Sequence, residues 1–120
     1  MIRTIALAGA LVAVAGPAAA ECGPADFELI KPLVHHKPNS RYLRLTGEVV
    51  NHCAAPAGVQ MRLVQRGADD EVVGVDEFWP ASISNIAPGD SLPFDLVFDW
   101  RNPAKGKSKL TIIGARSWGN

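Results

Sequence analysis

The strongest constraint on the fold is a period-two pattern in the C-terminal third of the chain. Large hydrophobic side chains occupy every second position from Leu92 to Trp100, and Asp95 and Asp99 fall on the opposite phase. Side chains of a β-strand alternate between two faces, whereas an amphipathic helix repeats every three to four residues. The segment is therefore predicted to be a strand, and its apolar face is predicted to form the centre of the core. That face consists of Leu92, Phe94, Leu96, Phe98 and Trp100.

Similar alternation recurs along the rest of the chain, separated by turn signals rich in proline, glycine and asparagine, and no helical stripe is found. Further strands are expected at residues 27–34, 42–51, 59–64, 72–78 and from 110 to near 118. Turns are expected at 38–40, 53–58, 67–71, 86–90 and 102–107. The pattern predicts an all-β fold, an immunoglobulin-like antiparallel β-sandwich of six to eight short strands.

Parity within the strand at 42–51 separates core from surface. Leu43, Leu45 and Val49 share one face, while Tyr42 and Arg44 share the other. Gly47 falls on the core face, where a glycine suits a bulge or the close passage of a neighbouring strand.

The first strand is expected to lie at a sheet edge, because it contains Pro32 and a central strand cannot spare a backbone N–H. Its core face is predicted to consist of Phe27, Leu29 and Leu33. This edge could accept a partner by strand addition, although its prolines oppose that use.

Residues 1–20 have the pattern of a secretory leader. Arg3 precedes an uninterrupted apolar stretch, and Ala18, Ala19 and Ala20 supply the small residues that a signal peptidase recognises. Cleavage after Ala20 would leave residues 21–120 as a single domain. We expect a periplasmic or secreted protein without a transmembrane anchor after cleavage, because no later segment is apolar enough to span a bilayer.

Both cysteines, Cys22 and Cys53, follow the predicted leader. An oxidising compartment favours their pairing, and a single intramolecular disulfide is predicted. Closing a loop of this length stabilises a fold by about 3 to 4 kcal/mol in the chain-entropy model. The rival interpretation is a reactive or metal-binding thiol, but thiol oxidoreductases usually place their cysteines two residues apart.

Charge gives no support for binding to nucleic acid. The chain has 12 basic and 12 acidic residues, and removal of Arg3 keeps that balance within one charge. Nucleic-acid binding usually needs a basic excess on one face. The cluster of Lys105, Lys107 and Lys109 is interpreted as a solvated loop leading into the last strand.

Three ordered motifs resemble the FxLYD-type domain, an immunoglobulin-like β-sandwich of exported and surface bacterial proteins. They are residues 45–51 (LTGEVVN), the alternating strand at 59–63 (VQMRL) and residues 87–94 (APGDSLPF), and the resemblance covers roughly 27–98. It implies a fold and an extracytoplasmic setting, with no catalytic residues and no cofactor. From the residues themselves, Asn51 is expected to cap a turn and Phe94 to enter the core.

A metal site is the alternative function. Its candidate ligands are His35, His36 and His52, and imidazole suits copper or zinc. The spacing argues against a shared ion, because adjacent residues of a strand such as His35 and His36 point to opposite faces. The expected state is surface histidines beside a disulfide.

Catalysis is not expected, because the serines lie in turn-like contexts without a nucleophile-elbow motif. Tyr42, Arg44 and Trp118 are the candidate binding residues, since aromatic and arginine side chains are enriched where proteins recognise partners. The sequence therefore predicts a small exported, noncatalytic binding module of the cell envelope with a possible protein partner. The alternative is a periplasmic protein that handles copper or zinc.

Overall fold

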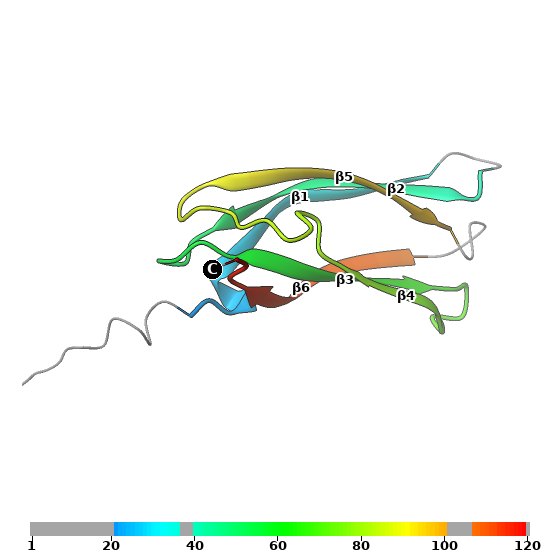
Figure 1. The fold of residues 1–120 in the computed structure, drawn as a ribbon. Coiled ribbons are helices and arrows are strands. Elements are labelled where there is room, and N and C mark those ends of the chain that lie inside the picture. Colours follow the sequence, from blue (N-terminus) through cyan, green and yellow to red (C-terminus); the bar gives the residue numbers. More distant parts are fainter. Residues whose placement is uncertain (1–20, 37–39, 101–106, 120) are drawn as a thin grey trace, which may run out of the picture.

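The structure is a computed structural model that describes residues 21–36, 40–100 and 107–119. Within these ranges a short 3₁₀ turn, η2 (Pro24–Asp26), precedes six strands. The strands are β1 (Phe27–His36), β2 (Tyr42–Asn51), β3 (Gly58–Arg66), β4 (Val72–Phe78), β5 (Ser91–Asp99) and β6 (Lys107–Arg116) (Figure 1). The predicted leader at 1–20 and nearly all of the predicted loop at 102–107 lie outside the described residues.

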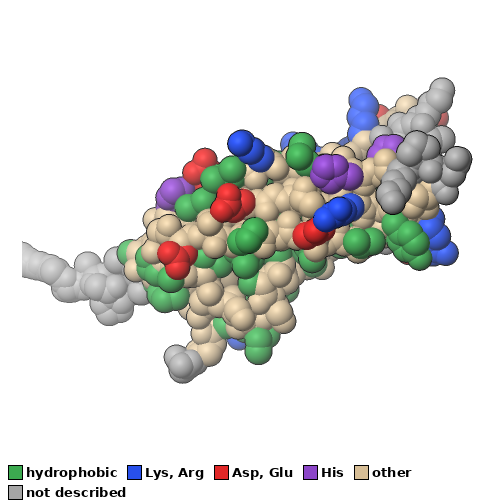
Figure 2. All heavy atoms as spheres, turned by 90° about the horizontal axis from the view of Figure 1, so that it is seen from above, with side chains coloured by type: hydrophobic (Ala, Val, Ile, Leu, Met, Phe, Trp, Pro, Cys, Tyr) green, Lys and Arg blue, Asp and Glu red, His purple; other side chains and the backbone are tan. Residues whose placement is uncertain are grey.

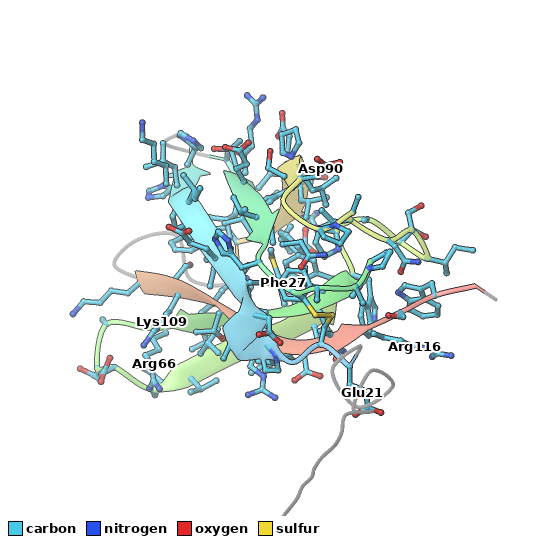
Figure 3. All side chains as sticks on the ribbon, turned by 90° about the vertical axis from the view of Figure 1, so that its left-hand side faces the viewer. Glu21, Phe27, Arg66, Asp90, Lys109 and Arg116 are labelled. Atoms are coloured by element: carbon cyan, nitrogen blue, oxygen red, sulfur yellow. A yellow bond between two sulfur atoms is a disulfide. The ribbon has the colours of Figure 1, made fainter. Side chains whose placement is uncertain are left out.

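The strands form two layered antiparallel sheets. In the described part of the chain, one sheet has the order β1-β2-β5 and the other β4-β3-β6. The chain crosses from one sheet to the other after β2, after β4 and after β5 (Figures 1 and 3). The strand orders make β2 and β3 the central strands of the two facing sheets. This architecture confirms the predicted all-β antiparallel sandwich. Across the described ranges no helix has the length and hydropathy that crossing a bilayer requires.

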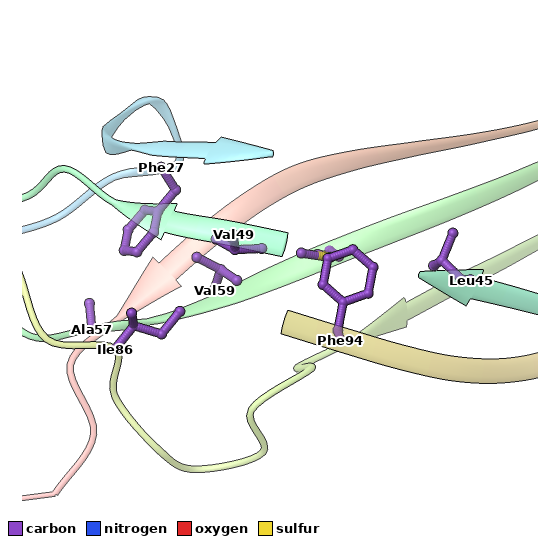
Figure 4. Close-up of a cluster of buried hydrophobic side chains, with 8 residues drawn as sticks. Phe27, Leu45, Val49, Ala57, Val59, Ile86 and Phe94 are labelled. Carbon is purple, nitrogen blue, oxygen red and sulfur yellow. The ribbon is translucent and has the colours of Figure 1, made fainter. Parts of the chain in front are cut away.

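The centre of the core comes from the two central strands. Leu43, Leu45 and Val49 of β2 face Met61 and Leu63 of β3, and all five side chains are fully buried, as their parity predicts. Strands with neighbours on both sides bury their inward side chains most completely, because neither flank is open to water. Figure 4 shows part of this layer.

The prediction that the face from Leu92 to Trp100 forms the centre of the core was only partly correct. Phe94 and Trp100 are buried, at 6% and 5% exposure. The other three, Leu92, Leu96 and Phe98, are half-buried and pack against the core. The reason is that β5 lies at the edge of its sheet, so its inward side chains are covered from one flank only.

β1 lies at a sheet edge, as predicted, but its core parity was wrong at Leu33. The β1–β2 register shifts between Ile30 and Leu33, and Lys31 within this bulge has a φ of 46°. The extra residue reverses the phase of the strand. Leu33 is consequently 54% exposed, and Val34 packs inward in its place.

Gly47 has the close neighbour that its position predicts. The Phe94 ring lies over it, and a Cβ on Gly47 would be 2.6 Å from Phe94 Cζ. The absence of a side chain at Gly47 of β2 therefore makes room for the Phe94 ring that β5 contributes to the core.

Candidate functional site

One end of the sandwich, where β2 ends and β3 begins, is held by the Cys22–Cys53 disulfide; we call it the disulfide end. The two Cα atoms are 5.8 Å apart across a sequence separation of 31 residues, which confirms the predicted pairing (Figure 3). Because both sulfurs are bonded to each other, neither is available as a thiolate ligand or nucleophile.

Asn51 links three segments at the disulfide end. Its buried side-chain amide donates hydrogen bonds to the carbonyls of Ala55, at 3.0 Å, and Ile86, at 2.7 Å. Its side-chain oxygen accepts a hydrogen bond from the backbone N–H of Cys53 at 2.7 Å. Asn51 therefore caps the turn after β2, as predicted, and also holds the segment that enters β5.

Trp118, one of the predicted binding residues, also lies at the disulfide end and is half-buried there. Its ring meets Trp79 edge-on at 5.2 Å, and the Arg116 guanidinium lies 4.2 Å from its centroid. Its backbone N–H donates to the side chain of Asn85 at 2.8 Å. Through these contacts Trp118 covers the core at the disulfide end, so its ring takes part in holding the fold together.

Tyr42 and Arg44, the other predicted binding residues, lie at the opposite end of β2, on the outer face of the β1-β2-β5 sheet. A surface pocket of about 370 Å³ opens here. Its lining consists of His35, His36, Ser40, Tyr42, Leu43, Arg44 and Val97. We call this the pocket end. The structure thus brings together two of the three predicted binding residues and separates Trp118 from them.

The pocket combines apolar surface with charged groups. Tyr42 is 53% exposed and Val97 is 63% exposed. Sequence reasoning did not select Val97, although its outward parity between Asp95 and Asp99 was a usable signal. On this face, basic and acidic side chains lie beside one another, with histidine and hydrophobic side chains close by (Figure 2).

An ion pair forms one wall of this surface. Arg44 donates hydrogen bonds to both carboxylate oxygens of Asp95, with Nε 2.8 Å from Oδ1. Hydrogen bonding to Arg44 lowers the pKa of Asp95; desolvation opposes this change, and the charges of Arg44 and His35 add to it. The same pair raises the pKa of Arg44. A second pair joins Arg41 to Asp99 at 3.5 Å.

The three predicted metal ligands do not meet. His35 is in register with Arg44 on the outer face, and its Nε2 is 3.1 Å from Thr46 Oγ1. His36, in register with Leu43, instead stacks on the Trp100 ring at 5.0 Å. The two adjacent histidines therefore point to opposite faces, as expected.

His52 lies at the disulfide end, where its Nε2 is 2.9 Å from Glu28 Oε1. In the part of the chain that the structure describes, no three histidine, cysteine, aspartate or glutamate side chains are arranged to hold a metal ion.

The class of protein that these features define is a small disulfide-bonded β-sandwich with a surface pocket beside Tyr42 and Arg44. A second surface pocket, of about 510 Å³, lies at the disulfide end and is lined by Glu21, Cys22, Ala115, Arg116 and Ser117. Comparison with models of protein families, with curated proteins and with solved structures finds no match for this chain. The resemblance to FxLYD-type domains stays a prediction.

Proposed function

We propose that this protein is an exported, noncatalytic binding module of the cell envelope that recognises a protein partner through its pocket end. The observation that carries the proposal is the exposed pair Tyr42 and Val97 beside the Arg44–Asp95 ion pair around one pocket. Recognition surfaces commonly combine aromatic and aliphatic anchors with arginine and a polar surround. The partner should insert an apolar side chain into the pocket and hydrogen-bond around it.

Export is supported by the disulfide and by the leader pattern of the sequence. A structural disulfide persists in oxidising compartments and is rare in the cytosol of mesophiles. Cys22 follows the predicted cleavage position by two residues, so the bridge would fasten the start of the mature chain to the turn after β2.

A noncatalytic role is supported by the arrangement around His35. Its ring nitrogen contacts the hydroxyl of Thr46, which is a pairing that nucleophilic catalysis could use. In the catalytic triads that activate a hydroxyl nucleophile, a carboxylate commonly orients the imidazole. Both oxygens of the nearby Asp95 accept hydrogen bonds from Arg44 instead. Thr46 and His35 therefore form a cross-strand surface contact.

Photocrosslinking in the native host tests the proposed site. A benzoylphenylalanine residue replaces Tyr42, and a matched control carries it at Ile83, which is 71% exposed on the segment between β4 and β5. We expect a defined covalent adduct from position 42 and none from position 83. Adding Val97→Asn should reduce the adduct at least fivefold while the melting temperature stays unchanged. Equal adducts at both positions, or none at position 42, would contradict the proposal.

A further inference from the structure

β5 offers the most regular open edge among the described strands. β1, β4 and β6 each contain a register shift against their neighbour. β5 pairs with β2 without a shift from Ser91 to Asp99 and has no hydrogen-bonded neighbour on its other side within the described ranges. Bulges protect sheet edges from pairing, so the absence of one leaves β5 able to take another strand.

A backbone hydrogen bond directly after β5 shows which backbone groups of β5 face this open edge. The N–H of Trp100 donates to the carbonyl of Arg41 at 2.6 Å, so even-numbered residues point toward β2. The odd-numbered residues therefore point away from β2. Pro93 agrees with this assignment, because its missing N–H would face the edge.

The available groups form a short window. Gln65 Nε2 donates to the carbonyl of Asp99 at 2.9 Å, so that acceptor is already used. The N–H groups of Asp95, Val97 and Asp99 and the carbonyls of Asp95 and Val97 remain on the open side. An incoming strand would meet them as hydrogen-bonded pairs.

The side chains of these same residues determine what such a strand must carry. Val97 is exposed between two aspartates. Each aspartate already pairs with one arginine on the side that faces β2: Asp95 with Arg44 of β2, and Asp99 with Arg41, which directly precedes β2. From the open side, a strand therefore meets an apolar side chain flanked by two carboxylates. Directly opposite pairs of opposite charge, and apolar pairs, stabilise neighbouring strands.

We propose that β5 binds an extended segment of the partner as an added antiparallel strand. The segment has an apolar residue opposite Val97 and a lysine or arginine opposite Asp95 and Asp99, which gives the pattern basic-x-apolar-x-basic. This inference rests on the proposed function, because Val97 also lines the pocket. Main-chain hydrogen bonds supply affinity, and the alternate side chains supply specificity.

A second copy of this chain fits the edge poorly. Two β5 strands paired antiparallel with Val97 opposite Val97 would place Asp95 of one copy opposite Asp99 of the other. Like charges directly opposite each other destabilise a strand pair. The charges of the edge therefore favour a basic partner over self-association.

Titration with short capped peptides tests the proposal on the oxidised protein by NMR. The probe contains Lys-Thr-Val-Thr-Lys, and its matched control contains Glu-Thr-Val-Thr-Glu. We expect the lysine peptide to bind at least tenfold more tightly. N-methylation of the central valine removes an N–H that faces β5 and should weaken binding at least tenfold. N-methylation of a neighbouring threonine, which faces away, should change it less than threefold.

Substitutions at Val97 test the same hydrogen bonds between peptide and β5 by changing the protein instead of the peptide. Val97→Pro removes the N–H of residue 97, which faces the open edge, and should abolish binding of the lysine peptide. The strand already contains a proline at an outward-facing position, Pro93. Val97→Thr keeps the N–H and should retain binding within threefold. If Val97→Pro unfolds, the double variant Asp95→Asn with Asp99→Asn must still lose the preference for lysine over glutamate.

The outcomes separate the two proposals. Equal affinity for the lysine and glutamate peptides, or equal effects of the two N-methyl groups, overturns strand addition. If the adduct from position 42 persists in that case, the proposed binding site stands with a different kind of partner. If position 42 gives no adduct in the crosslinking experiment, the proposed binding site itself is overturned.

Discussion

The two ends of the sandwich differ in how they are held. At the disulfide end, a covalent bridge, the three hydrogen bonds of Asn51 and the contact between Trp79 and Trp118 close the structure. At the pocket end, Tyr42 and Val97 are exposed around an open pocket. The disulfide and these contacts therefore lie far from the candidate binding surface. We expect substitutions of exposed residues at the pocket end to leave the fold intact.

The core shows the same asymmetry. A cluster of eight buried residues, Phe27, Leu45, Val49, Ala57, Val59, Met61, Ile86 and Phe94, extends from the disulfide end into the middle of the sandwich (Figure 4). Toward the pocket end the buried cluster contains Leu43, Leu63 and Trp100. In this one respect the two ends are alike: among the described atoms, the buried Nε1 groups of Trp100 at the pocket end and of Trp118 at the disulfide end have no hydrogen-bond partner.

The largest predicted effect is at the disulfide. Replacing Cys22 and Cys53 by serine should lower the free energy of unfolding by about 3 to 4 kcal/mol, because the unfolded chain regains the entropy of an open loop. Urea unfolding of the oxidised protein and the double variant measures this difference. A loss below about 1 kcal/mol would contradict the prediction that the bridge fastens this end.

Asn51→Ala should have the next largest effect, about 2 to 3 kcal/mol. The substitution leaves the carbonyls of Ala55 and Ile86 and the N–H of Cys53 without their buried partner. Chemical denaturation measures the change. The matched control is Ser40→Ala at the pocket end, which removes an exposed acceptor for the N–H of Tyr42 and should cost less than about 0.5 kcal/mol.

Gly58→Ala should destabilise the disulfide end by about 1 to 3 kcal/mol through overpacking. A Cβ there would be 2.8 Å from the carbonyl oxygen of Ser84 and 3.0 Å from Trp118 Nε1. Gly114→Ala is the control, because its Cβ would be at least 3.4 Å from its neighbours. Melting temperatures of both variants test the prediction, and a similar loss in both would contradict it.

Tyr42→Ala should change stability by less than about 0.5 kcal/mol, because the side chain is half exposed on the outer face. It should nevertheless weaken partner binding through the pocket end. Thermal unfolding and the crosslinking assay, with the photoreactive group moved to Ser40 at the rim of the same pocket, measure the two effects separately. A large loss of stability would show that the pocket end also fastens the fold.

The smallest predicted effect is on the stability of the protein at acidic pH, through Asp95. Because the folded protein lowers the pKa of Asp95, its contribution to stability is complete above the unfolded value of about 3.9 and is lost as the pH falls through the folded value. Asp95→Asn should therefore flatten the dependence of stability on pH below about pH 4. Urea midpoints across this range test it, and an unchanged slope in the variant would contradict it.

The sequence predicted the strands, the core face of β2, the disulfide and the capping role of Asn51, because alternation and turn residues act locally. It did not predict the bulge at Lys31, which reversed the phase of Leu33, because a bulge depends on how a neighbouring strand pairs. It also overestimated the burial of β5, because a period-two pattern does not distinguish an edge strand from a central one.

For the site, parity placed Tyr42 and Arg44 on the surface but could not show that Val97 and His36 lie beside them. Those neighbours come from β5 and β1, which pair with β2 across long separations in sequence. The grouping of Trp118 with Tyr42 reflected residue type alone. In the structure, Tyr42 pairs with Asp99 at one end of the sandwich, whereas Trp118 contacts Asn85 at the other end.

The hydrogen bond from Gln65 to the carbonyl of Asp99 limits how far a neighbour can extend along β5. Pro93 imposes the other limit, because it has no N–H to offer. Between these two stops, Asp95 and Val97 are the residues that offer both an N–H and an unused carbonyl to the open side. A guest peptide thus has a single alignment available, and sliding by two positions would forfeit contacts at one stop or the other.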